Sequence, residues 1–221
     1  MYERVGILTL MVGSLLLITL SLIKGADDWQ NQTIRNYLSD IKKSAEQENG
    51  IVGTLNSLVE PVSQGPFIDH QAFGLYYSWL AFTSQDKASI ETFSLKSVEQ
   101  FQLQLAQRPL DSSVVIDKAN QMWRNGAEFD AVVAEFHYAQ EVGRYEPFTV
   151  MQSLKYYLAH WPELSLTDKK QTISYLLDHK RYKMKLWQYD SILKLPVIGE
   201  RACNILAFNS VKPYYCRMKI K

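Results

Sequence analysis

The residues that could carry acid–base or metal chemistry are few in this chain, and they are scattered along it. None of the four histidines belongs to an H-E-x-x-H motif. Glu135 and His137 lie two residues apart, a spacing that places them on different sides of a helix. Neither a G-x-S-x-G nucleophile motif nor a phosphate-binding loop motif occurs. The sequence therefore predicts no catalytic centre, no cofactor and no metal site.

Glu146 is the carboxylate whose surroundings most resemble a site, because it lies in the phrase "GRYEPFTV" with a glycine and an aromatic residue. A catalytic role is one interpretation. The favoured one is an acid at the start of a helix, where the helix dipole stabilises negative charge. A glycosidase needs two facing carboxylates at a set separation, and no spacing in the sequence establishes such a pair.

Aromatic residues are abundant, with 13 tyrosines and 5 tryptophans. Such side chains can stack on sugar rings, but more often they fill the interfaces between packed helices. Core packing is therefore the favoured interpretation for most of them. The candidates for a binding surface are Trp123, Tyr145, Tyr156 and Trp161.

Basic residues gather in the stretch "HKRYKMK" at residues 179–185 and again in the C-terminal tail. They could meet an acidic polysaccharide or anionic lipid headgroups, or they could be a solvated helix end and a soluble tail. The net charge of the whole chain is only +1, which argues against nucleic-acid binding.

The N-terminus contains 19 consecutive uncharged residues, 5–23. As a helix this run spans roughly 28 Å, about one hydrocarbon thickness. Lys24 precedes Ala26 closely, which makes a poor signal-peptidase site. We interpret residues 1–26 as an uncleaved signal anchor that binds the membrane through residues 5–23, with a cleaved signal peptide as the alternative.

Cys203 and Cys216 are the only cysteines. An even pair in an exported domain favours one disulfide, which would contribute about 3 kcal/mol in the chain-entropy model. Two reduced thiols in a cytosolic domain are the alternative. The charges around the apolar run give only a slight bias in orientation. Together with the cysteine pair they predict a cytoplasmic N-terminus and an exported C-terminal domain.

Beyond the anchor, apolar residues recur at helical spacing, and no strand-like run of comparable length competes with them. We predict an all-α fold, with a helix and hinge over residues 27–66 and a helical domain over 67–221. The first helix can continue from the membrane span. A seventh helix of the series is predicted around Tyr182, Leu186, Tyr189 and Leu193.

Two similar phrases, "QRPLDSSVV" and "GRYEPFTV", place Pro109 and Pro147 38 residues apart. Helix pairs with a proline-marked turn and a period near this length are typical of tetratricopeptide-like arrays, in which stacked helical hairpins complete the core. "GAEFDAV" resembles the turn and second-helix start of such a repeat, with Gly126 in the turn and Ala131 at the small packing position. Gly143 would end one helix before Pro147 starts the next. An ordinary helical bundle is the alternative.

The layout also resembles a narrower family, the VpsP-type accessory proteins of bacterial exopolysaccharide biosynthesis. The motifs that carry the resemblance are, in order, Arg108-Pro109-Leu110-Asp111, the phrase at residues 143–150, Leu158-Ala159-His160-Trp161, and Cys203 with Cys216. They cover roughly residue 95 to the C-terminus, together with the anchor.

This resemblance implies a single-pass protein of the bacterial inner membrane with a tetratricopeptide-like domain in the periplasm. The expected function is that of a non-catalytic scaffold or assembly factor in exopolysaccharide (biofilm matrix) biosynthesis or export. Its expected partners are other membrane or periplasmic proteins of a polysaccharide assembly system, and polysaccharide is a further candidate. The alternatives are an adaptor of a pilus or secretion system and a polysaccharide-modifying enzyme.

Overall fold

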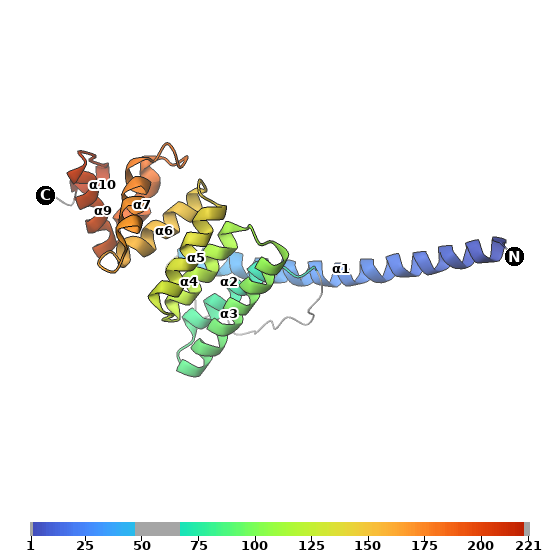
Figure 1. The fold of residues 1–221 in the computed structure, drawn as a ribbon. Coiled ribbons are helices and arrows are strands. Elements are labelled where there is room, and N and C mark those ends of the chain that lie inside the picture. Colours follow the sequence, from blue (N-terminus) through green and yellow to red (C-terminus); the bar gives the residue numbers. More distant parts are fainter. Residues whose placement is uncertain (1, 47–66, 219–221) are drawn as a thin grey trace. The chain divides into compact units, whose positions relative to one another are not determined.

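The computed structural model describes residues 2–46 and 67–218, and this part of the chain is helical without any strand (Figure 1). The helices are α1 (Tyr2–Glu46), α2 (His70–Thr83), α3 (Lys87–Gln107), α4 (Ser112–Arg124), α5 (Phe129–Val142), α6 (Pro147–Ala159), α7 (Leu166–Leu177), the 3₁₀ helix η2 (Leu186–Tyr189), α8 (Asp190–Leu193), α9 (Pro196–Phe208) and α10 (Tyr214–Met218). The predicted all-α fold, with a long apolar N-terminal helix followed by helical hairpins, is confirmed.

Contacts divide the chain into two compact units, Met1–Gln107 and Arg108–Lys221, here called unit 1 and unit 2. The sequence analysis divided the chain elsewhere, at residues 26 and 66, and that division stays a prediction. The hinge expected before residue 67 and the last basic residues of the tail lie outside the described residues.

The first half of α1 is apolar and exposed, and its second half belongs to the core of unit 1. An 18-residue window within Thr9–Lys43 has a mean hydropathy of 1.8, and none of it is buried. The helix is therefore long and apolar enough to cross a membrane. It then continues without a break, so that Ile34 and Ile41 are fully buried. The predicted continuity between the span and the first helix of the folded part is confirmed.

Polar side chains of α1 fix the segment that starts α2. Asn31 donates from Nδ2 to the carbonyl of Phe67 at 2.8 Å and accepts from the Asp69 amide at 2.8 Å. Asp27, one turn earlier, accepts from the Phe67 amide at 3.2 Å. Arg35 adds an ion pair to Asp69 at 2.6 Å. Residues 27–35 of α1, which follow the apolar run, therefore bind the start of α2 through their own side chains.

Helices α2 and α3 form a hairpin that packs on this part of α1. Phe73 and Tyr76 of α2 are fully buried in a cluster with Ile34. Ser97 of α3 donates to the carbonyl of Gly74 at 2.7 Å, and the Phe101 ring lies against the same glycine. A side chain at position 74 would push the two helices apart, so Gly74 permits their close approach.

Unit 2 is built from the hairpins α4–α5 and α6–α7, followed by the short C-terminal helices. The turn of the first hairpin needs Gly126, whose φ of +73° lies in the left-handed region. Ser165 caps α7 by accepting from the Asp168 amide. A large apolar cluster that includes Leu154, Leu176 and Leu193 fills the space between α6, α7, α8 and α9.

The seventh helix predicted around residues 182–193 is wrong in its first part, whereas residues 186–193 are helical as expected. Residues 178–185 form tight turns, and only the short η2 and α8 follow. Tyr182 and Met184 are only 2% and 3% exposed. In a helix, residues two positions apart point to different sides, so one packed face would not bury both. Lys183 between them takes a φ of 54°, which reverses the chain and turns both side chains inward.

The predicted disulfide is present. Cys203 on α9 is bonded to Cys216 on α10, with their Cα atoms 5.6 Å apart. Cys216 is buried in the apolar cluster of unit 2. The bond therefore fastens the last described helix to the core of the unit.

Candidate functional site

The two phrases that gave the repeat its period meet at a buried joint in unit 2. Ser112, at the start of α4, donates to Glu146 Oε2 at 2.5 Å and accepts from Thr149 Oγ1 at 3.1 Å. Gly143 ends α5 beside them, and a Cβ at that position would collide with the Ser112 side chain. We call Ser112, Gly143, Glu146 and Thr149 the joint. These residues pack and hydrogen-bond the first turn of α4 against the first turn of α6.

Glu146 stands at the start of α6, as the sequence analysis expected. It is the N-cap residue of the helix but makes no side-chain cap bond. Its exposed carboxylate instead accepts a hydrogen bond from the buried Ser112 hydroxyl, which thereby has an acceptor. This hydrogen bond gives Glu146 a structural role that requires no catalysis.

The repeat-turn residues lie where helices begin and end. Pro147 occupies the first turn of α6, and Gly143 caps α5. Pro109 precedes α4, and its carbonyl accepts from the Tyr138 hydroxyl at 2.9 Å. Ala131 differs from the expectation because it is exposed, whereas Ala139, two turns later, is fully buried. The face of α5 that packs is therefore the one with Val132, Phe136 and Ala139.

The candidate aromatic surface does not form a single patch. Tyr156 is 1% exposed and stacks on Phe136 with ring centroids 4.6 Å apart. Trp123 packs edge-on against Tyr156 at 5.0 Å. Trp161 packs on the apolar cluster of unit 2, with Lys169 Nζ 5.9 Å from its ring centroid. Core packing, the favoured interpretation of most aromatics, thus describes these three.

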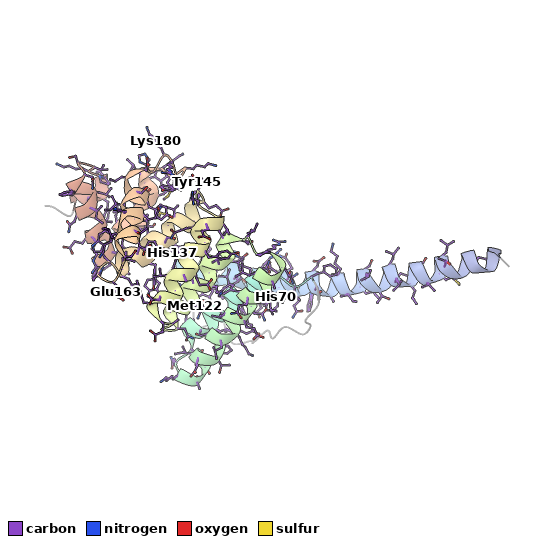
Figure 2. The ribbon with its side chains drawn as sticks, viewed as in Figure 1. His70, Met122, His137, Tyr145, Glu163 and Lys180 are labelled. Atoms are coloured by element: carbon purple, nitrogen blue, oxygen red, sulfur yellow. A yellow bond between two sulfur atoms is a disulfide. The ribbon has the colours of Figure 1, made fainter. Side chains whose placement is uncertain are left out.

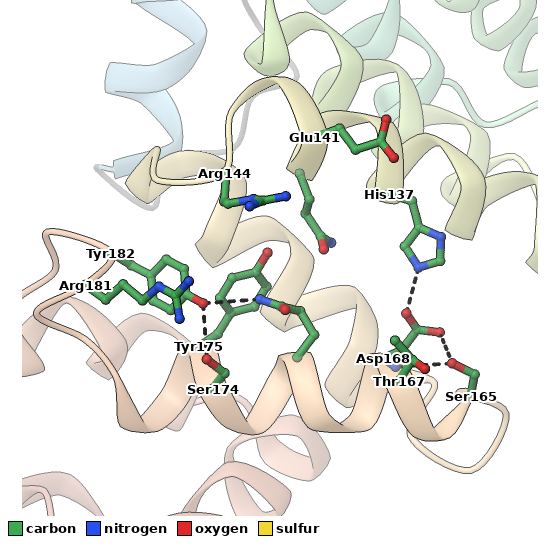
Figure 3. A pocket seen from close by; sticks show the side chains of 12 residues that line it. His137, Glu141, Arg144, Ser165, Thr167, Asp168, Ser174, Tyr175, Arg181 and Tyr182 are labelled. Atoms are coloured by element: carbon green, nitrogen blue, oxygen red, sulfur yellow. Dashed lines mark hydrogen bonds and ion pairs between the residues drawn. The ribbon is translucent and has the colours of Figure 1, made fainter.

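Tyr145 is the exception and leads to a different feature. Figure 2 labels this residue, which is 44% exposed. Its ring centroid lies 6.2 Å from that of Tyr182. Tyr182 lines a polar cavity of about 520 Å³ in unit 2, which we call the groove (Figure 3). The residues that line it are His137, Gln140, Glu141, Arg144, Ser165, Thr167, Asp168, Gln171, Ser174, Tyr175, Arg181 and Tyr182.

One side of the groove carries two guanidinium groups. Arg144 follows α5, and Arg181 lies in the turns after α7, with its Cζ 5.9 Å from the Tyr182 ring centroid. Hydrogen bonding to Arg181 and the charge of that guanidinium lower the pKa of the Tyr145 phenol, and Arg144 adds to the effect. In the part of the chain that the structure describes, neither arginine forms an ion pair with a carboxylate.

The opposite side of the groove carries His137, Asp168 and Ser165, which are the residue types of a catalytic triad (Figure 3). His137 Nε2 lies 2.6 Å from Asp168 Oδ1, and Ser165 Oγ donates to Asp168 Oδ2 at 2.6 Å. In a triad the histidine lies between the serine and the acid, where it can accept the serine proton. Here the acid lies in the middle, so this arrangement does not activate the serine as a nucleophile.

The floor of the groove is held by hydrogen bonds to buried tyrosines. Tyr182 Oη accepts from Gln171 Nε2 at 3.3 Å and lies 3.1 Å from Ser174 Oγ. Gln140 donates to the Tyr157 hydroxyl at 2.8 Å. Burial raises the pKa of Tyr157 and of Tyr175 well above the ordinary value for tyrosine. These phenols stay protonated, so the floor presents neutral polar groups.

The arrangement supports binding of a small polar ligand with a negative charge. Within the described residues, no cluster of histidine, cysteine, aspartate and glutamate could hold a metal ion. No protein-family model matches the chain, and comparison with curated proteins and with solved structures finds no match either.

The groove was not predicted from the sequence, although some of its residues lie in segments that the sequence singled out. Arg144 and Tyr145 belong to the phrase at residues 143–150, and Arg181 belongs to the basic stretch at 179–185. Nothing in the spacing brings these segments together. Asp168 and His137 are 31 residues apart, and no sequence signal indicates their contact.

Proposed function

We propose that this protein is a non-catalytic, membrane-anchored scaffold or assembly factor in bacterial exopolysaccharide biosynthesis or export. It spans the inner membrane once and exposes its folded part to the periplasm. There it binds other membrane or periplasmic proteins of the polysaccharide assembly system through its helical-hairpin surface.

The observation that carries this proposal is the continuity of α1. The same helix supplies the apolar run and, through Ile34 and Ile41, the core of unit 1. Asp27 and Asn31 bind the backbone of the segment that starts α2, within two turns of that run. If the apolar run spans the membrane, this continuous helix holds unit 1 close to the membrane surface, which supports a role as an anchored scaffold.

The disulfide supports the periplasmic location. Such bonds persist in oxidising compartments and are rare in the cytosol. The bond between Cys203 and Cys216 fastens α10 to the core, so its presence matters to the fold of unit 2.

Two contacts favour binding over catalysis. Glu146, the carboxylate that most resembled a site, accepts a buried hydroxyl at the joint. Asp168 lies between His137 and Ser165, an order that leaves the serine without a base. The assignment to exopolysaccharide rests on the family resemblance of residues 108–111, 143–150 and 158–161.

The proposal is tested by deleting the gene in the bacterium that encodes it and measuring extracellular polysaccharide. We expect polysaccharide to fall and the full chain to restore it. A chain in which a cleavable signal peptide replaces residues 1–26 is the matched control and should not restore it, since the anchor is lost.

Unchanged polysaccharide after deletion would contradict the proposal. Loss of pili or of a secreted protein with unchanged polysaccharide would favour an adaptor of another envelope machine instead. Full restoration by the unanchored chain would contradict the role of the membrane helix.

A further inference from the structure

The groove has a cationic side that two separate segments build. Arg144 comes from the end of the α4–α5 hairpin, and Arg181 comes from the turns after α7 (Figure 3). Among the described residues, neither has a carboxylate within ion-pair distance. A guanidinium presents planar donors that match a carboxylate, and two of them beside one cavity can hold a single carboxylate from two directions.

The other side of the groove carries acidic acceptors. Asp168 is mostly buried and accepts from Ser165 and pairs with His137, and Glu141 is exposed on the rim. A ligand with several negative charges, such as an acidic peptide, would place one of them against these carboxylates. A ligand with one carboxylate and several hydroxyl groups satisfies both sides, because hydroxyl groups donate to carboxylate oxygens.

The size of the groove and its aromatic edge fit a sugar ring. Its volume of about 520 Å³ is in the range of small-ligand sites. Tyr145 exposes a flat ring next to Tyr182, on the side where the arginines lie. Such a face can pack against the apolar C–H face of a sugar, while the phenol keeps its hydrogen bond to Arg181.

We propose that the groove of unit 2 binds an acidic sugar. The carboxylate of the sugar lies between Arg144 and Arg181, and its hydroxyl groups point toward Glu141 and Asp168. The choice of a sugar rests on the proposed function, whereas the pairing of opposite charges rests on the groove alone.

The test is ligand-observed NMR with the full chain in lipid nanodiscs. The probes are D-glucuronate and D-galacturonate, with D-glucose and D-galactose as neutral counterparts that lack only the carboxylate. We expect the uronates to bind at least about tenfold more tightly than the neutral sugars, since a charged hydrogen-bonded pair contributes about that factor.

The variant that breaks the site is the double substitution Arg144→Gln with Arg181→Gln. We expect it to weaken uronate binding at least about tenfold, with neutral-sugar binding and melting temperature unchanged. Lys180→Gln is the matched control, because it removes a positive charge beside Arg181 from a residue that does not line the groove. It should keep the affinity of the parent chain.

Three results would overturn the inference: equal affinity for uronates and neutral sugars, acetate binding as tightly as the uronates, or tighter binding of triglutamate. Acetate would indicate a plain anion site, and triglutamate an acidic peptide. None of these results touches the deletion assay, so failure of the groove and failure of the proposed function are distinguishable.

Discussion

The joint and the groove draw on the same eight residues, 143–150, and use them in opposite ways. At the joint, Gly143, Glu146 and Thr149 meet Ser112, whose side chain is enclosed and hydrogen-bonded. At the groove, Arg144 and Tyr145 are exposed beside Arg181. One short segment thus connects two helices through three of its residues and supplies the groove with Arg144, beside which Tyr145 is exposed.

The difference shows which polar residues follow from packing and which do not. The Ser112 and Thr149 hydroxyls are buried, so each needs a partner, and the joint supplies one. The two arginines of the groove form no ion pair with a carboxylate of the described residues, and Arg181 contacts the side chains of Tyr145 and Tyr182. We propose that they serve a ligand, which substitutions can distinguish from a role in packing.

Alkaline pH is expected to have the largest effect, because it ionises tyrosines that are buried in the core of unit 2. Burial raises the pKa of Tyr156 to about 12 and also raises those of Tyr157, Tyr175 and Tyr189. Their contribution to stability is fully present below about pH 10, where tyrosine is neutral in the unfolded chain too. It is lost as the pH rises from there through the folded-state pKa.

We therefore expect unit 2 to unfold cooperatively above about pH 10, with all four phenols ionising together. Circular dichroism and tyrosinate absorbance, recorded on the same samples, check this. Ionisation of these phenols with full retention of helix signal would contradict their burial.

Gly143→Val is expected to break the joint. The new side chain would collide with Ser112, and overpacking of this kind costs about 3 kcal/mol in the free energy of unfolding. Arg144→Val is the matched control, because it places the same side chain one position later, at an exposed residue, and should change stability by less than about 0.5 kcal/mol. Chemical denaturation measures the free energy of unfolding of each variant. An equal decrease in the two variants would contradict the distinction between joint and groove.

Tyr145 is expected to show the smallest effect, a shift in titration without a change in stability. Its pKa should be lower than that of an ordinary tyrosine because of Arg181 and then Arg144, opposite to the buried tyrosines. NMR of ¹³Cζ-labelled tyrosine, assigned with Tyr145→Phe, would detect it. The shift should become smaller in Arg181→Gln, disappear when Arg144→Gln is added, and persist in Lys180→Gln.

The helices, and the helix ends at Gly143 and Pro147, could be predicted from the sequence because their signals are local, whereas the contact of Ser112 with Glu146 joins residues 34 positions apart and could not. Pro147 starts a helix, and Ser165 caps one. The turns at 178–185 could not be predicted, since the left-handed Lys183 carries no glycine signal and Tyr182 and Leu186 imitate a helical stripe. Ala131 was misplaced because this chain has one more residue between Gly126 and Phe129 than the usual tetratricopeptide pattern, and the face of α5 that packs is the one with Val132, Phe136 and Ala139.

The groove lay beyond prediction for a related reason. Arg144 and Arg181 are brought together by the packing of α5 on α6 and α7, not by any spacing in the chain. The basic stretch at 179–185 was visible, but only the turn at Lys183 decides which of its residues faces the cavity. The disulfide was predictable because two cysteines leave one intramolecular pairing.

The most direct test of the division between joint and groove is the affinity of the Glu146→Gln chain for D-glucuronate, measured in nanodiscs beside the parent chain. Glu146 is two residues from Arg144 but belongs to the joint. We expect the free energy of unfolding to fall by about 1–2 kcal/mol, because the hydrogen bond from Ser112 is weakened, and the affinity for D-glucuronate to stay unchanged. A fall in affinity as large as that of the Arg144→Gln, Arg181→Gln chain, with stability unchanged, would contradict it.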